Sequence, residues 1–189
     1  MKSLIKRLTD TSSGGKQLPC FTRYIMSYIS GYNHDKYWKR REALVNPQSG
    51  VNSLLKIYYL LWIKRVDKKQ HCSFGTGFNS GASFATPPFL PHGPNGIIVG
   101  NDAKIGSNVT IYHQVTIPAG GVVVGDKTTF FPGAKVIEGV KIGSNCTIGA
   151  NVVVCEDIPD YSTVVPSKAR IILKDKKNDI INGDETTPI

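Results

Sequence analysis

Apolar residues recur at every sixth position between residues 99 and 154, with one interruption. A small or β-branched residue follows most of them four positions later, and turn formers such as Gly106-Ser107-Asn108 stand between the repeats. Two inward positions and a turn in so short a period predict a parallel β-helix, because an α-helix cannot hold these positions on one face. Each hexad supplies one strand and one corner, and three hexads close a triangular coil. The repeated positions are Val99, Ile105, Ile111, Ile117, Val124, Phe130, Val136, Ile142, Ile148 and Val154.

The repeat is interrupted by two insertions. Three extra residues lie between Leu90 and Val99, within segment 91–96, and one lies in segment 118–121. Before them, Phe78, Phe84 and Leu90 keep the spacing of six in a less regular first coil. Insertions in a solenoid form surface loops, which commonly carry function.

The pattern of apolar residues over 1–70 predicts helices. Apolar spacing predicts one helix over 21–29, ended by Gly31, and a second over 35–43 that begins at Asp35 and ends before Pro47. A third, over 53–69 with Asn52 or Ser53 as its cap, is apolar nearly all round, so we expect it to be buried on both sides. The predicted fold is mainly β: a β-helix over 71–172, preceded by a basic, mostly helical extension over 1–70 and followed by a polar tail over 173–189.

Charge is concentrated in the helical extension. The net charge is +9; residues 1–70 hold 14 Lys and Arg against 4 Asp and Glu, and residues 71–189 hold 9 against 10. A basic segment can meet nucleic acid, anionic lipid or a phosphorylated substrate, or can simply be a solvated face. A peripheral contact with the inner face of a membrane and a solvated basic face both stay open, and no nucleic acid partner is expected, because aromatic and basic residues interleave only over 37–41.

Cysteine usage and hydropathy predict the compartment. The four cysteines, at 20, 72, 146 and 155, show no paired spacing, which favours a reducing environment. The longest apolar run, 54–63, contains Lys56 and is far shorter than the about 20 residues of a membrane-spanning helix. The start of the chain lacks an apolar core of signal-peptide length, so we expect a cytoplasmic protein.

Two of the four histidines occupy the same step of the repeat. His92 follows Leu90 by two residues, His113 follows Ile111 by two, and their separation of 21 equals one coil of 18 plus the three inserted residues. If the insertion bulges outward, the two imidazoles lie one coil apart at about 5 Å. A neutral imidazole is the usual general base near pH 7, although His113 is equally consistent with a ladder of surface residues. His34 and His71 lie outside the regular repeat and are expected to be structural or exposed.

The segment from Leu90 to Gly100, followed by Val109-Thr110-Ile111 and Val115-Thr116-Ile117, resembles the serine acetyltransferase branch of the hexapeptide-repeat acyltransferases. Segment 162–172 is similar to the ending of that family, and the resemblance covers about 78–172. It implies a left-handed β-helix, a homotrimer with sites in the grooves between subunits, acetyl-CoA as donor without a metal, and His92 as catalytic base.

Three departures from that branch affect the expected acceptor. Pro91 and Gly77 stand where the serine-specific enzymes have Asp, and loop 118–121 is short and has no His. We therefore expect O-acetylation of a sugar hydroxyl in surface polysaccharide (capsule, lipopolysaccharide or exopolysaccharide), with a polymer, lipid-linked or nucleotide-linked acceptor left open. Serine O-acetylation and a non-catalytic trimeric scaffold remain alternatives. A zinc lyase like the γ-class carbonic anhydrases is disfavoured, since its pair of histidines five residues apart is missing.

Candidate residues follow for each part of the reaction. Backbone N–H groups of a Gly-bearing corner are expected to stabilise the oxyanion, and no cysteine has a partner base, which favours direct transfer. Asp102 and Asp126 fall at corners, where a turn role is expected. Asn79 aligns close to the family's upstream Asp and is a candidate to orient His92, with a plain turn role as the alternative. The acceptor-groove candidates are His113, Asn79 and Asn95, and the CoA candidates are Lys168, Arg170, Lys174, Gly120, Gly121 and Ala134.

Overall fold

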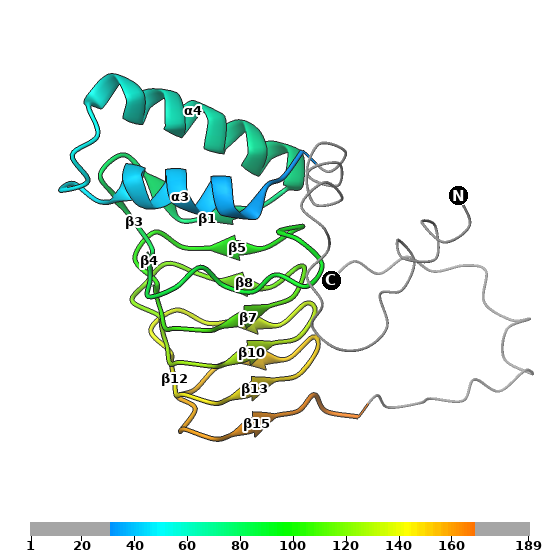
Figure 1. Ribbon diagram of the computed structural model, residues 1–189. Coiled ribbons are helices and arrows are strands. Elements are labelled where there is room, and N and C mark those ends of the chain that lie inside the picture. The colour runs from blue at the N-terminus through cyan, green and yellow to red at the C-terminus, as the bar shows by residue number, and fades with distance from the viewer. Residues whose placement is uncertain (1–30, 169–189) are drawn as a thin grey trace, which may run out of the picture.

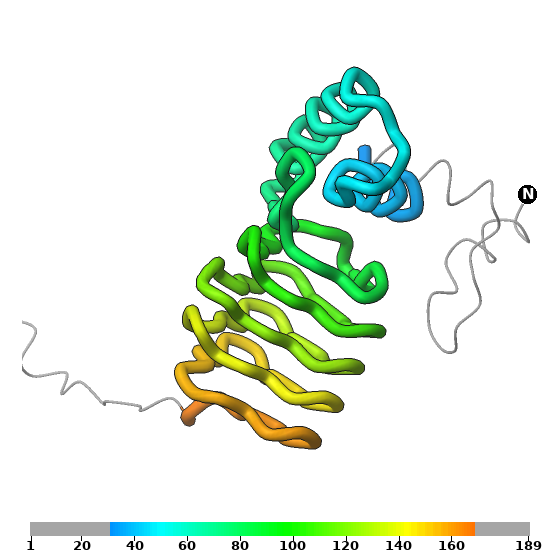
Figure 2. The backbone as a smooth tube through the Cα atoms, turned by 90° about the vertical axis from the view of Figure 1, so that its left-hand side faces the viewer, coloured from blue at the N-terminus to red at the C-terminus, as the bar shows by residue number. Residues whose placement is uncertain are grey.

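The computed structural model describes residues 31–168. These residues form a parallel β-solenoid of about five coils with two helices at its N-terminal end (Figure 1). Figure 2 shows the coils stacked one upon another, with the helices at the end opposite the last coil. The β-helix and its helical cap are thus confirmed, and the fold fits the left-handed form.

The strands stack into three faces. Face 1 holds β1 (Ser73–Phe74), β5 (Ile98–Val99), β8 (Thr116–Ile117), β11 (Lys135–Val136) and β14 (Val153–Val154). Face 2 holds β4 (Ser83–Phe84), β6 (Lys104–Ile105), β9 (Val123–Val124) and β12 (Lys141–Ile142). Face 3 holds β7 (Thr110–Ile111), β10 (Thr129–Phe130), β13 (Thr147–Ile148) and β15 (Thr163–Val164). The hairpin β2 (Thr76–Gly77) and β3 (Ser80–Gly81) is antiparallel and stands outside these faces.

The hexad sets the strand register. Val99 pairs with Ile117 and Val136 with Val154, so each repeated residue stacks on its counterpart one coil away. All ten repeated positions are buried, and Ile111, Ile117, Phe130 and Ile148 are fully enclosed. Alternate residues of a strand point to opposite faces, so the second residue of each pair fills the core and its neighbour points outward.

Left-handed backbone at the corners lets the chain turn sharply. At the corner between faces 3 and 1, Gln114 has φ 60°, Gly133 74° and Asn151 56°. Successive turns stack there, because the amide of Gln114 donates to the carbonyl of Asn95 and the amide of Gly133 donates to that of His113. Asn and Gly tolerate this conformation best, which explains their place in the repeat.

Two helices form the cap. Helix α3 (His34–Val45) begins at Asn33, whose Oδ1 accepts from the Lys36 amide at 2.9 Å. Helix α4 (Ser53–Gln70) begins at Asn52, which accepts from the Leu55 amide at 2.8 Å. These bonds satisfy amides that lack partners within the helix. Both predicted helices are therefore confirmed, with Asn33 rather than Asp35 capping the first; the helix expected over 21–29 lies outside the described residues.

A buried arginine joins α3 to the first coil. Arg41 Nη2 donates to the carbonyls of Phe74 and Ala82, both at 2.7 Å, and its Nε donates to Thr76 Oγ1 at 3.1 Å. Burial lowers its pKa to about 10. Because a buried guanidinium is costly unless its donors are satisfied, these bonds fix the position of the cap on the coil.

Two expectations are wrong. Phe78 was placed in the repeat but lies in the β2–β3 hairpin and is 40% exposed. Helix α4 is buried on one side only, because Leu54 is 80% exposed and Leu61 is 66% exposed.

Cys72, Cys146 and Cys155 are free thiols. Within residues 31–168, no helix is long and apolar enough to cross a membrane.

Candidate functional site

The two histidines of the repeat meet at the corner between faces 3 and 1. Nδ1 of His92 lies 2.9 Å from Nδ1 of His113, and the ring centroids are 5.0 Å apart. His92 is exposed and His113 half-buried, so the pair is open to solvent. The predicted juxtaposition, one coil apart across the inserted loop, is confirmed.

The inserted segment bulges at this corner because the flanking strands keep their register. Phe89 bridges Thr110 on face 3, and Ile98 pairs with Thr116 on face 1, so residues 90–97 must close the corner between them. The amide of Gly96 donates to the Gln70 carbonyl at 3.3 Å, and the amide of Ile97 donates to that of Pro94 at 3.1 Å. These bonds anchor the end of the loop that carries His92.

The hydrogen bond between the two Nδ1 atoms constrains which nitrogens of the two rings carry protons. Only one proton lies in the bond between the two Nδ1 atoms, so one imidazole donates and the other accepts. The donor, when neutral, has a free lone pair on Nε2, whereas the acceptor carries its proton there. One ring of the neutral pair thus presents a base and the other holds that base in place.

Aromatic rings extend the site along the same corner. Tyr112 packs edge-on against His92 with centroids 5.2 Å apart, and its other side stacks on Phe131 at 5.3 Å with an interplanar angle of 8°. Phe131 is 38% exposed. This aromatic pair is not among the residues predicted from the sequence. Its separation of 19 residues, one coil plus one inserted residue, is the signal that identifies it.

The other acceptor-groove candidates lie apart from the pair or beside it. Asn95 is exposed in the same loop, and its carbonyl accepts from the Gln114 amide. Asn79 instead occupies the β2–β3 turn with φ 53°, and its Oδ1 accepts from Lys56 Nζ at 2.6 Å. The expected orienting bond to His92 is therefore made by His113, and Asn79 has the turn role.

The CoA candidates divide between two corners. Ala134 is fully buried at the corner of the histidines, and Lys168 follows β15, the last strand of face 3, as an exposed side chain. Gly120 and Gly121 follow β8 on face 1 and therefore lie at a different corner. Arg170 and Lys174 lie outside the described residues.

The Gly120 and Gly121 amides already have an acceptor. Both donate to the carboxylate of Asp102 at 3.0 Å, and these backbone hydrogen bonds lower the pKa of Asp102. Asp126 likewise accepts from the Ser107 amide at 2.7 Å. The turn role expected for both aspartates is confirmed, and these two glycine amides are not free for an oxyanion within the single chain.

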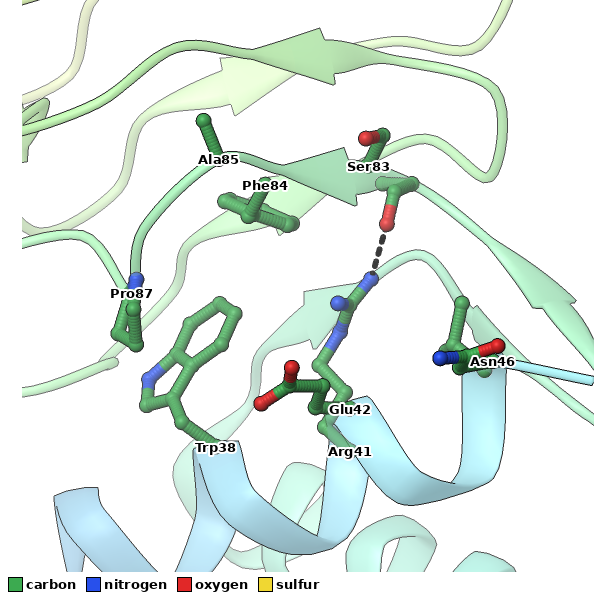
Figure 3. Close-up of a pocket in the computed structure, with 10 residues that line it drawn as sticks. Trp38, Arg41, Glu42, Asn46, Ser83, Phe84, Ala85 and Pro87 are labelled. Carbon is green, nitrogen blue, oxygen red and sulfur yellow. Dashed lines mark hydrogen bonds between the residues drawn. The ribbon is translucent and has the colours of Figure 1, made fainter. Parts of the chain in front are cut away.

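A surface pocket of about 330 Å³ lies elsewhere, between α3 and β4 (Figure 3). Its lining includes Trp38, Arg41, Glu42, Phe84 and Pro87, and Figure 3 shows Arg41 already hydrogen-bonded inside it. The pocket contains no histidine, so the corner is the better candidate for acid–base chemistry. Among residues 31–168, no group of three His, Cys, Asp or Glu side chains is placed to hold a metal ion.

Comparison with known proteins identifies similar repeats in the β-helix. Residues 121–156 match the family described as bacterial transferase hexapeptide (six repeats), and residues 93–113 match the hexapeptide repeat of succinyl-transferase. Over these residues the β-helix is similar to the hexapeptide repeats of bacterial transferases. The second match begins directly after His92 and ends at His113.

Curated relatives of this hexapeptide-repeat domain are serine acetyltransferases. The chain is 39% identical over 108 residues to that of Staphylococcus aureus, covering 53% of this chain and 50% of the relative. It is 38% identical over 109 residues to that of Helicobacter pylori, covering 54% of this chain and 63% of the relative. The chain therefore spans about half to two thirds of the length of these proteins.

Solved structures support the fold. Serine acetyltransferase of Neisseria gonorrhoeae superposes with a TM-score of 0.59 at 21% identity, covering 94% of this chain and 68% of that one. A serine acetyltransferase solved in complex with CoA gives 0.57 at 23% identity, covering 77% and 57%. The hexapeptide-repeat architecture is thus shared with them.

Proposed function

We propose that this protein is an acetyl-CoA-dependent O-acetyltransferase in which His92 is the general base. The observation that carries the proposal is the His92–His113 hydrogen bond, which leaves one Nε2 lone pair free at an exposed corner of a transferase-type repeat. The serine acetyltransferase relatives support the reaction type, and the CoA complex of one fold neighbour supports the donor.

The proposed reaction is direct transfer. His92 Nε2 removes the proton of the acceptor hydroxyl while the hydroxyl oxygen attacks the thioester carbonyl carbon. The carbon–sulfur bond then breaks, and His92 gives the proton to the departing sulfur, so that CoA leaves as its thiol and His92 is neutral again. His113 accepts the Nδ1–H of His92 throughout, which holds the ring and favours the imidazolium formed during the attack.

The donor is proposed to lie along the corner between faces 3 and 1. Lys168 follows the last strand of face 3, four coils beyond His92, and adjacent coils are separated by one strand spacing. The distance between them is therefore about 19 Å. An exposed ammonium at that distance suits the phosphates at the far end of an extended CoA, while the thioester meets His92.

The comparisons favour L-serine as acceptor, which is the alternative to a polysaccharide sugar named in the sequence analysis. The named relatives and fold neighbours are all serine acetyltransferases. A second candidate, the hydroxyl of a surface-polysaccharide sugar, is favoured by the chemistry of the corner. Segments 90–97, 112–115, 131–134 and 149–152 contain no Asp or Glu to neutralise the ammonium of an amino acid, but they carry the stacked Tyr112 and Phe131.

The assembly is proposed to be a homotrimer. Within one chain, the glycine corner at 118–121 and the histidine corner lie on different edges of the prism. A neighbouring copy is needed to bring two such edges together, as expected for sites between subunits. Light scattering should give three times the chain mass of 20.6 kDa, and a monomer that still transfers acetyl groups would exclude a shared site.

One assay tests the proposed function. The purified chain is mixed with acetyl-CoA and either L-serine or a panel of monosaccharides and oligosaccharides, and release of free CoA thiol is followed. Acetylation of serine alone supports the first acceptor, and acetylation of a sugar alone supports the second. Failure of every acceptor, together with no binding of acetyl-CoA, would support the scaffold alternative instead.

A further inference from the structure

Helix α4 is apolar on two opposite sides. Its inner side packs on α3, and Ile63 and Val66, which are 0% and 6% exposed, belong to the buried core. Residues of the opposite side are spaced by three or four positions and so form one stripe along the helix. The exposed apolar members of that stripe are Leu54 at 80%, Ile57 at 46%, Tyr58 at 52% and Leu61 at 66%.

Cations continue the stripe toward the end of the helix. Arg65 and Lys68 follow Leu61 at the same spacing and are exposed, and Lys64 and Lys69 flank them. Isolated exposed leucines need no explanation, but a continuous apolar surface that leads into a basic one marks an interaction site.

Aromatic rings paired with cations border the stripe. The guanidinium of Arg40 from α3 lies 4.3 Å from the ring centroid of Trp62 and 5.4 Å from that of Tyr58. Lys36 Nζ lies 5.6 Å from the Trp62 ring. Tryptophan, tyrosine and basic side chains prefer the boundary between hydrocarbon and polar headgroups, where their apolar bodies and polar tips are both satisfied.

We infer that the exposed stripe of α4 is a docking surface for an anionic lipid bilayer, with Leu54, Ile57 and Leu61 entering the headgroup region. The helix then lies along the surface, because it is not long and apolar enough to cross a membrane. Charge complementarity identifies the occupant. Residues 31–70, which contain the two helices, hold 9 Lys and Arg against 3 Asp and Glu, so this basic end of the described structure faces an anionic surface.

Vesicle sedimentation of the full chain tests this surface. Vesicles of phosphatidylglycerol and phosphatidylcholine are compared with phosphatidylcholine alone, for wild type, a Leu54→Ser/Leu61→Ser variant and a Lys64→Glu/Lys68→Glu variant. The chain should partition at least about tenfold better onto the anionic vesicles, and either double variant should lower that partition at least about tenfold. A Val153→Ser/Val165→Ser variant, which changes two exposed valines of the β-helix, is the matched control and should bind as wild type.

Other outcomes overturn the inference. Equal partition onto neutral and anionic vesicles would show that charge does not drive membrane binding. Undiminished binding of both α4 variants would show that the membrane contact lies outside the exposed stripe of α4. If the Leu54→Ser/Leu61→Ser variant lowers the oligomer mass in light scattering while wild type ignores vesicles, the stripe is an interface between copies. All substituted side chains are exposed, so circular dichroism should show unchanged folding.

Discussion

Nδ1 of His92 lies 2.9 Å from Nδ1 of His113, across an insertion that separates the two residues by one coil and three residues. The bond makes the histidines unequal, because only the donor presents a free Nε2 lone pair while the pair is neutral. We assign the donor role to His92, which is the more exposed ring. His113 is then a positioning residue.

That assignment predicts different effects of two substitutions at residue 113. Asn can place its Oδ1 near the position of His113 Nδ1 and still accept from His92, so His113→Asn should retain kcat within about tenfold of wild type. His113→Ala removes a hydrogen bond to a group that becomes cationic during the reaction, worth about 1.5–3 kcal/mol, and should lower kcat about ten- to hundredfold. Steady-state kinetics at saturating acetyl-CoA measures both. Equal losses in the two variants would show that the acceptor atom at 113 is unimportant.

Donor binding should stabilise the folded protein. A ligand that binds only the native state adds about 2.7 kcal/mol at a hundredfold excess over Kd, which thermal unfolding with acetyl-CoA detects. Lys168→Ala should reduce the shift with CoA more than the shift with dephospho-CoA if its ammonium meets the 3′-phosphate. Identical reductions for the two ligands would place Lys168 away from that phosphate.

A buried hydroxyl joins two coils of the solenoid. Thr128 Oγ1 donates to the Gly143 carbonyl at 2.8 Å and accepts from the Cys146 amide at 3.3 Å. Thr128→Val has nearly the same shape but leaves both backbone groups unpaired, so it should lower the free energy of unfolding by about 1–3 kcal/mol. Thr129→Val, on the outward side of β10, is the matched control and should change it by less than about 0.5 kcal/mol. Denaturant titration compares them, and equal effects would exclude this cross-coil bond as the cause.

Asp67 should make the cap sensitive to pH. Its Oδ1 accepts from the Tyr37 hydroxyl at 2.6 Å while Oδ2 is buried without a partner, and burial raises the pKa of Asp67 against the opposing effects of Tyr37, Lys64, Cys72 and Arg41. A carboxyl with a raised native pKa binds its proton more tightly when folded. The stability that it contributes is therefore present at acid pH and is lost as pH rises from about 4 through the native pKa.

The measurement is thermal unfolding of wild type and Asp67→Asn between pH 4 and 7. The melting temperature of wild type should fall relative to that of the variant as pH rises. A Glu156→Gln variant, which changes an exposed carboxyl of the β-helix, should follow wild type at every pH. A constant difference between wild type and Asp67→Asn would show that Asp67 does not titrate in this interval.

The fold could be predicted because the six-residue repeat identifies the inward-facing positions directly. Ile111, Ile117 and Phe130 are fully buried as their spacing requires, and the separation of 21 residues between His92 and His113 predicts that the two rings lie together. Counting works because every coil has nearly the same length, so an insertion changes the register by a known amount.

The parts that depend on irregular structure could not be predicted this way. Phe78 continues the spacing of six, but residues 76–81 form an antiparallel hairpin whose Asn79 binds Lys56. The link between Arg41 and the carbonyls of Phe74 and Ala82 joins segments more than 30 residues apart, and no local pattern reports it. Gly120 and Gly121 were expected to bind CoA, but the carboxylate of Asp102 one coil away accepts hydrogen bonds from their amides.

The rate of acetyl transfer by the His92→Ala variant tests most directly whether His92 is the general base. With the acceptor found for wild type, His92→Ala should lower kcat by about 10²–10⁴, the usual contribution of a general base. The dissociation constant for acetyl-CoA should not change, because the imidazole acts on the acceptor hydroxyl. A wild-type kcat in His92→Ala, or a large loss confined to His113→Ala, would contradict the assignment of His92 as the base.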